Sequence, residues 1–137
     1  MLELDYYIEK KMVYYARQAA PIEACALLFG QDDLIDEYYP MLNLDQSEVH
    51  FTFDPQEQNL ALKEARKRDQ VDLGVFHSHP DKESEAYPSP EDVDKAAPGY
   101  KYFILNFTDE DQRNYELGAF EIEGEEITEI EYEVLER

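Results

Sequence analysis

The chain has 137 residues, of which 43% are hydrophobic, so it can bury the core of a single domain spanning residues 1–137. Its 33 acidic and 12 basic residues give a formal net charge of −21, which argues against nucleic acid as a partner because phosphate binding needs clustered Lys and Arg. The acidic residues are spread along the chain, as expected either in a cell with high internal salt or for a protein with a basic partner.

Three further features bear on where the protein works. The chain has one Cys, which cannot form an internal disulfide. Its first residues lack the basic start and apolar core of a signal peptide, and no apolar run approaches the length of a membrane span. We therefore expect a cytoplasmic protein that does not associate with a membrane.

The first half of the chain predicts two helices among three strands. Asp5 can cap a helix that runs to about Ala19, because apolar residues recur there at spacings of three and four. A second helix is expected to about Arg68, with Asp54 as its cap and Pro55 at its first position. Apolar or alternating runs predict strands at 25–29, 34–39 and 49–53.

The second half predicts more strands and one short helix. Ser89 can cap that helix, which runs from Pro90 to about Ala97. Gly124 is free to adopt a positive φ and indicates a hairpin turn before the last strand. Strands are expected at 71–76, 102–107, 115–122 and 127–134. Helices at three places among many strands argue for an α/β fold with a mixed sheet.

Two histidines, His77 and His79, follow the predicted strand 71–76. Side chains two residues apart on a strand point to the same side, so both imidazoles can reach one ion. Asp92, near the start of the short helix, can approach from a third direction. Two nitrogens and one oxygen leave a position for water, which is how catalytic zinc sites are built. The sequence therefore predicts a metal site, most suited to Zn²⁺, although iron and cobalt accept similar ligands.

Asp92 and Ser89 also have a structural interpretation. The pattern Ser89-x-x-Asp92 resembles a capping box, and the intervening Pro90 favours a first helical turn. Beside the histidine pair, metal binding by Asp92 is the favoured interpretation. The hydroxyl of Ser89 could stabilise a developing oxyanion, but the capping role would engage the same side chain.

A carboxylate also stands at the entrance to the buried strand 25–29. Burying the charged side chain of Glu23 there is unfavourable unless it is paired or has a chemical role. The role that fits is that of a general base beside the metal. A surface glutamate is the alternative. Cys25 could instead be a nucleophile, but its apolar neighbours favour a buried and unreactive thiol. His50 is expected to be structural, in a strand away from the histidine pair.

Several segments together resemble the JAMM, or MPN-plus, zinc metalloprotease motif. The resemblance covers about residues 6–120 and is closest to small stand-alone prokaryotic members. It implies a deaminase-like α/β/α sandwich with a mixed, mostly antiparallel sheet. The segments that carry it are Pro21-x-Glu23, the apolar run to Gly30, Gly74-Val75-Phe76-His77-Ser78-His79-Pro80 and Ala86-Tyr87-Pro88-Ser89-x-x-Asp92.

The resemblance implies His77, His79 and Asp92 as zinc ligands, with Glu23 and Ser89 as the catalytic residues. It implies a metallopeptidase that cleaves peptide or isopeptide bonds, with a ubiquitin-like or sulfur-carrier protein that ends in a Gly-Gly tail as its partner. Addition of that tail as a strand is one way to bind it. The alternative is a catalytically inactive MPN-type protein-binding module.

One departure from the usual motif lies in the loop before the short helix. Ser89 comes ten residues after His79, whereas the usual pattern has eight. The extra length falls in the polar segment 81–85, and loops absorb insertions at little cost. We expect this loop to bulge outward, to leave the ligands in place and to bear on substrate entry.

Overall fold

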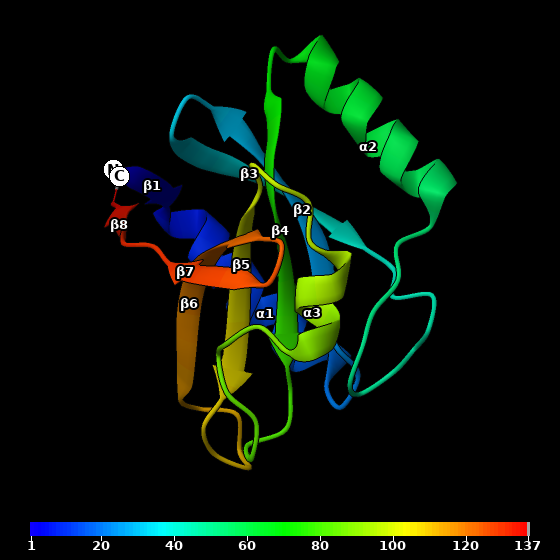
Figure 1. Cartoon of the computed structure of the whole chain (residues 1–137), viewed down its shortest axis with the longest axis vertical. Coiled ribbons are helices and arrows are strands. Elements are labelled where there is room, and N and C mark those ends of the chain that lie inside the picture. The colour runs from blue at the N-terminus through cyan, green and yellow to red at the C-terminus, as the bar shows by residue number, and fades with distance from the viewer. Residues whose placement is uncertain (137) are drawn as a thin grey trace.

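A computed structural model describes residues 1–136 and contains one eight-stranded sheet with helices packed on it (Figure 1). The helices are α1 (Tyr6–Ala19), α2 (Pro55–Lys67) and α3 (Pro90–Lys95). The strands are β1 (Leu2–Asp5), β2 (Cys25–Gln31), β3 (Leu34–Met41), β4 (Val71–His79), β5 (Lys101–Phe107), β6 (Tyr115–Glu123), β7 (Glu126–Glu129) and β8 (Tyr132–Leu135). Of these elements, the sequence did not predict β1.

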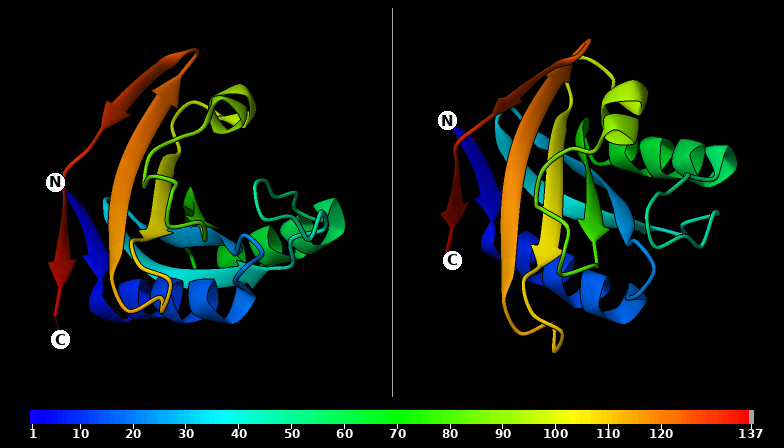
Figure 2. Two further views of the ribbon diagram at one scale, coloured as in Figure 1. Left: turned by 90° about the horizontal axis from the view of Figure 1, so that it is seen from below. Right: turned by 60° about the horizontal axis from the view of Figure 1, so that its bottom comes forward.

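The strands follow the order β7-β6-β5-β4-β2-β3-β1-β8 across the sheet. Pairs β2–β3, β2–β4, β5–β6 and β6–β7 are antiparallel, whereas β1–β3, β1–β8 and β4–β5 are parallel. The predicted mixed, mostly antiparallel sheet is confirmed. Figure 2 shows that the sheet curls strongly, so that its two ends approach each other.

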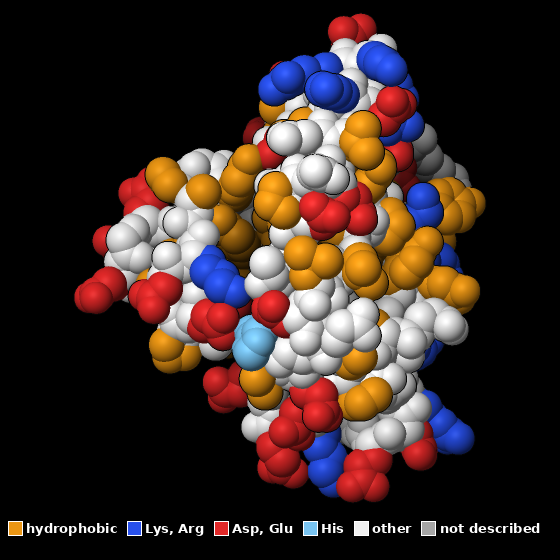
Figure 3. All heavy atoms as spheres, turned by 90° about the vertical axis from the view of Figure 1, so that its right-hand side faces the viewer, with side chains coloured by type: hydrophobic (Ala, Val, Ile, Leu, Met, Phe, Trp, Pro, Cys, Tyr) orange, Lys and Arg blue, Asp and Glu red, His pale blue; other side chains and the backbone are white. Residues whose placement is uncertain are grey.

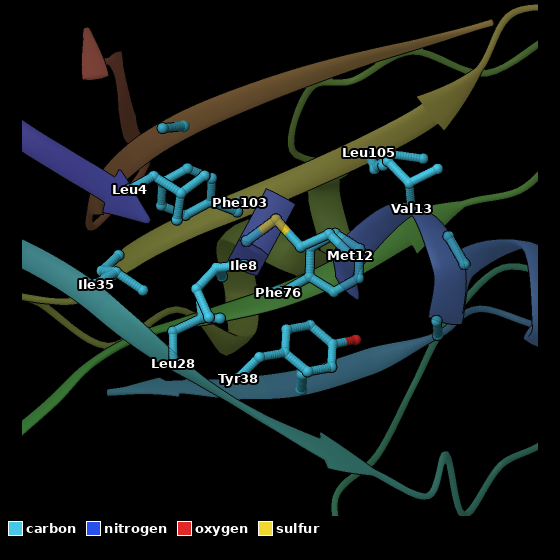
Figure 4. Packing of buried hydrophobic residues seen from close by; sticks show 14 of the residues in the cluster. Leu4, Ile8, Met12, Val13, Leu28, Ile35, Tyr38, Phe76, Phe103 and Leu105 are labelled. Carbon is cyan, nitrogen blue, oxygen red and sulfur yellow. The ribbon is translucent and has the colours of Figure 1, made fainter. Parts of the chain in front are cut away.

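Helix α1 packs on one face of the sheet. Its start is capped as predicted, with the Asp5 side chain accepting a hydrogen bond from the Tyr7 amide at 2.9 Å. The spacing of its apolar residues places one stripe against the strands, where it forms a buried cluster (Figure 4). Members of this cluster include Ile8, Met12, Leu28, Phe76 and Phe103.

Helix α2 lies over the opposite face. Asp54 caps it by accepting from the Gln56 amide at 2.9 Å, and Pro55 occupies the first turn, both as predicted. Small residues on its inner side, Ala61 and Ala65, pack against a second buried cluster that includes Leu27, Phe29, Ile104 and Phe120. Helices on both faces of one mixed sheet confirm the predicted α/β/α arrangement (Figure 2).

The strand predicted at 49–53 is wrong, because this segment is an irregular loop. The alternation reported burial only in part, since Phe51 and Phe53 both pack against the second cluster but Val49, in the same phase, is exposed. However, within residues 1–136 no strand pairs with this segment. The loop is held instead by the Asn43 side chain, whose oxygen accepts from the amide of Thr52 at 3.2 Å.

The single edge strand predicted at 127–134 is also wrong. The chain breaks into β7, which pairs with β6 at one end of the sheet, and β8, which pairs with β1 at the other end. Between them the amide of Ile130 donates to the carbonyl of Ala119, and the Ile130 side chain packs on the first cluster. A short connection therefore bridges the two ends of the curled sheet.

A group of basic side chains lies at the C-terminal end of α2. Figure 3 shows the face that carries α2, with basic side chains grouped at one end and apolar side chains over its middle. The last turn of α2 contains Arg66 and Lys67, and Arg68 follows directly. Among the residues that the structure describes, no helix is long and apolar enough to cross a membrane.

Candidate metal centre

The end of β4 brings His77 and His79 together in the interior, where they are 1% and 8% exposed. The strand extends beyond its predicted end and includes both residues. Their Nε2 atoms lie 3.2 Å apart, so both imidazoles point toward one place. Gly74, earlier on β4, lets the neighbouring strand lie close, because a Cβ there would be 2.2 Å from the Lys101 carbonyl oxygen.

Asp92 reaches the same place from the first turn of α3. Its Oδ2 lies 3.1 Å from Nε2 of His77 and 3.5 Å from Nε2 of His79. The same Oδ2 accepts from the Ser89 amide at 2.8 Å, while Oγ of Ser89 accepts from the Asp92 amide at 3.1 Å. The capping box is therefore present, and it holds the carboxylate against the histidines rather than competing with them.

The three side chains fit a bound metal ion. Zinc binds imidazole nitrogen and carboxylate oxygen at about 2.0–2.2 Å, so tetrahedral ligand atoms lie about 3.3–3.5 Å apart. The observed separations are 3.1, 3.2 and 3.5 Å. Nδ1 of His79 must donate to the Glu85 carbonyl, 2.7 Å away, which leaves a lone pair on its Nε2. Thus His77, His79 and Asp92 form a group that can hold a metal ion.

The charges in this group depend on each other. Burial would raise the pKa of Asp92, but hydrogen bonds with His77 and His79 hold it well below its usual range. Burial would lower the pKa of His79, yet the hydrogen bonds with Asp92 and the Glu85 carbonyl raise it overall. For the fully enclosed His77, burial prevails and lowers the pKa. The carboxylate is thus ionised and His77 neutral, the forms that bind metal.

Glu23 is buried just before β2, with only 3% of its surface exposed. Burial raises its pKa to about 8, against the opposing charge of nearby His79. Its Oε1 atom has no hydrogen-bond partner among the described residues. A buried carboxyl group with an unsatisfied oxygen is costly, so its position beside the histidines calls for a ligand or a chemical task.

The backbone around Glu23 is fixed by side chains that the sequence did not single out. Ser78 lies between the two histidines, and its Oγ accepts from the Ala24 amide at 2.8 Å. Nδ2 of Asn43 donates to the Glu23 carbonyl at 3.2 Å. The position of Ser78 within the histidine motif was the signal that could have identified it. Asn43 offered no such signal, because its partners are distant in sequence or belong to the backbone.

The lengthened loop after β4 takes part in the site. Residues 81–85 are exposed, as expected, but the Glu85 carbonyl turns inward to His79. Nδ2 of Asn106 secures the start of the loop by donating to the carbonyls of His79 and Asp81, each at 2.8 Å. The extra residues therefore supply a partner that orients a histidine, as well as protruding.

The remaining two candidates behave differently from the metal group. Cys25 pairs with His77 across β2 and β4, but its Sγ lies 3.6 Å from the Met41 carbonyl, and burial raises its pKa to about 12. Such a thiol is protonated at neutral pH, which argues against a nucleophilic role. His50 is half-exposed in a loop beside α3, with Nδ1 3.9 Å from Glu91, so the expected strand location away from the motif is wrong.

A curled mixed sheet that places a His-x-His strand end against an Asp from the next helix defines a JAB/MPN-type protein. The family model "Prokaryotic homologs of the JAB domain" matches residues 7–118, and the chain belongs to this family. The JAMM-type resemblance seen in the sequence is thereby confirmed. The solution structure of a Desulfitobacterium hafniense protein is similar to this chain at a TM-score of 0.88 with 37% identity, covering 100% of this chain and 94% of that one.

Curated relatives are similar in sequence. The CysO-cysteine peptidase of Mycobacterium tuberculosis is 32% identical over 128 residues, which cover 92% of this chain and 86% of the relative. A desampylase from Pyrococcus furiosus is 34% identical over 61 residues, or 44% of each protein. A JAB1/MPN domain protein from Archaeoglobus fulgidus shares the fold at a TM-score of 0.62 and 22% identity, covering 98% of this chain and 97% of that one.

Proposed function

We propose that this protein is a zinc-dependent peptidase or isopeptidase that hydrolyses the bond after the C-terminal glycines of a ubiquitin-like or sulfur-carrier protein. The observation that carries the proposal is the approach of His77, His79 and Asp92 within 3.1–3.5 Å of one another beside a buried carboxyl group. The names of the CysO-cysteine peptidase and the desampylase support this class of reaction and of substrate.

In this proposal His77, His79 and Asp92 hold the ion. When bound, such an ion polarises the scissile carbonyl and increases the acidity of water. Glu23 takes a proton from the attacking water and delivers it to the departing nitrogen, so that the C–N bond breaks and a free amine leaves. Burial raises the pKa of Glu23 to about 8 in the metal-free site, and the positive charge of a bound ion would lower it, which favours the carboxylate that accepts the proton.

Ser89 is the proposed oxyanion donor. Its Oγ uses a lone pair to accept from the Asp92 amide, which leaves the hydroxyl hydrogen free to be donated elsewhere. Capping and oxyanion stabilisation therefore use different parts of one hydroxyl group. Because the cap fixes the oxygen in place, the donor is already oriented before substrate binds.

The alternative, an inactive protein-binding module, explains less of the site. A binding module has no need for an ionisable group at 3% exposure with an unsatisfied oxygen, and such a group lowers stability. A general base must be close to the scissile bond and shielded from bulk water, and the burial of Glu23 within reach of the charge of His79 supports that role. The buried carboxyl therefore favours the enzyme.

The test combines metal analysis with cleavage of a ubiquitin-like fusion that ends in Gly-Gly and a short extension. We expect about one zinc per chain and cleavage after the second glycine, located by mass spectrometry and lost on chelation. Glu23→Gln should retain the metal and lose at least about a hundredfold in rate, the usual range for a general base. Glu126→Gln, an exposed substitution on β7, is the matched control.

Three results would contradict the proposal. Cleavage that persists in chelator would remove the metal from the reaction. Full activity in the Glu23→Gln variant would remove Glu23 as the base. If zinc binds but no fusion is cleaved by any variant, the binding-module alternative stands.

A further inference from the structure

A cavity of about 360 Å³ opens directly beside the metal group. His77 and Asp92 form part of its wall, so whatever fills it lies next to the reacting bond. Most of the remaining wall is apolar or aromatic, contributed by Val75, Phe51, Phe53, Tyr100 and Tyr102. Its size and lining suit one amino-acid residue with an uncharged side chain.

The wall of the cavity also contains a positively charged side chain, that of Lys95. Among the described residues, Lys95 is the only basic side chain in the wall. It follows Asp92 by three positions on α3, so the two side chains share one face of that helix. Asp92 points to the metal group, and Lys95 lies in the neighbouring aromatic wall of the cavity.

Contacts place the ammonium group close to the metal group. The rings of His77 and Phe51 have centroids 4.8 Å apart, and Nζ of Lys95 lies 5.6 Å from the Phe51 centroid. Lys95 also donates to the Phe51 carbonyl at 2.9 Å. Phe51 therefore contacts both groups, and the two distances together place Nζ of Lys95 within about 10 Å of the His77 ring.

The present partner of Lys95 is easily replaced. Its Nζ lies 3.0 Å from Oε1 of Glu91, but both side chains are 45% exposed, and exposed ion pairs contribute little to stability. A substrate carboxylate could take the place of Glu91 while the hydrogen bond to the Phe51 carbonyl remains. The cavity then offers a charge-assisted contact to an anion within one residue of the scissile bond.

We infer that Lys95 binds the free C-terminal carboxylate of a single residue attached to the carrier tail. This inference rests on the proposed function. The carboxylate of such a residue is two bonds from its amide nitrogen, so it would lie near the scissile bond, and Lys95 shares the wall of the cavity with His77 and Asp92. The uncharged side chain of that residue fills the aromatic cavity. The protein is thus a carboxypeptidase that removes one terminal residue, and Lys95 distinguishes that substrate from an internal or isopeptide bond.

The test compares two forms of one substrate. A ubiquitin-like carrier ending in Gly-Gly-Leu is prepared with a C-terminal carboxylate and with a C-terminal amide. We expect wild type to prefer the carboxylate form by about ten- to a hundredfold in kcat/KM, as one charge-assisted hydrogen bond would provide. Lys95→Met should reduce this ratio to near one, whereas Lys95→Arg should keep most of it. Lys67→Met, on the outer side of α2, is the matched control.

A binding measurement separates this inference from the proposed reaction. Calorimetry with the Glu23→Gln variant and the peptide Gly-Gly-Leu, as acid and as amide, should show the same preference and its loss on Lys95→Met. Equal affinity for the two peptides, or equal cleavage of the two carriers by wild type, would overturn the inference while leaving the proposed hydrolysis intact. Failure of all cleavage with a retained binding preference would contradict only the hydrolysis.

Discussion

Replacing Glu23 by Gln should stabilise the metal-free protein at neutral pH, because the native carboxyl resists ionisation where it is buried. Burial raises the pKa of Glu23 from 4.5 to about 8. Each pH unit between the two values costs the folded state about 1.4 kcal/mol, since the unfolded chain ionises and the native group does not. At pH 7 the loss in the free energy of unfolding reaches about 3 kcal/mol. Gln does not ionise, so the Glu23→Gln variant does not have this loss.

The sign follows from a raised carboxyl pKa. The favourable contribution of protonated Glu23 is fully present below pH 4.5 and is lost as pH rises toward 8. Urea unfolding in chelator at pH 5, 6, 7 and 8 should therefore show a stability difference between Glu23→Gln and wild type that grows with pH. For the exposed Glu126→Gln control the difference should stay constant. A pH-independent difference for Glu23→Gln would refute the idea that the native carboxyl is desolvated.

Three other predictions concern the groups around this residue. Added Zn²⁺ should raise the Tm of wild type by binding only the folded state, and Asp92→Ala should abolish that increase in a thermal melt; an equal increase in both would place the ion elsewhere. Ser78→Ala should cost about 1–3 kcal/mol in urea unfolding, because the buried Ala24 amide loses its side-chain acceptor, and an unchanged midpoint would contradict this. Asn43→Ala should speed hydrogen exchange at the Thr52 amide, and equal protection would show that another contact orders the loop.

The metal group could be predicted because its geometry is local. The two-residue period of a strand brings His77 and His79 to one side, and the capping pattern from Ser89 to Asp92 fixes a carboxylate at the next helix start. Each feature depends on neighbours within a few positions of the chain. Glu23 was recognisable for a different reason, since a charged group at the entrance to a buried strand needs an explanation.

What could not be predicted depends on distant parts of the chain. The apolar residues of a segment such as 49–53 favour burial, as Phe51 and Phe53 show, but they do not indicate whether a neighbouring strand exists. The orientation of His79 comes from a backbone carbonyl, that of Glu85, and backbone groups are the same in every residue. The break between β7 and β8 arises from the curl of the whole sheet, which no short window of sequence contains.

The parallel pairing of β1 with β8 has a consequence for how the chain becomes a folded protein. Leu2 lies opposite Tyr132, so β1 meets one of its two neighbours only after β8, which comes much later in the chain, has been synthesised. Until then Leu4, which is fully enclosed in the finished molecule, lacks part of its cover. A truncation that removes residues 132–135 should therefore expose the edge of β1 and make the protein prone to aggregate.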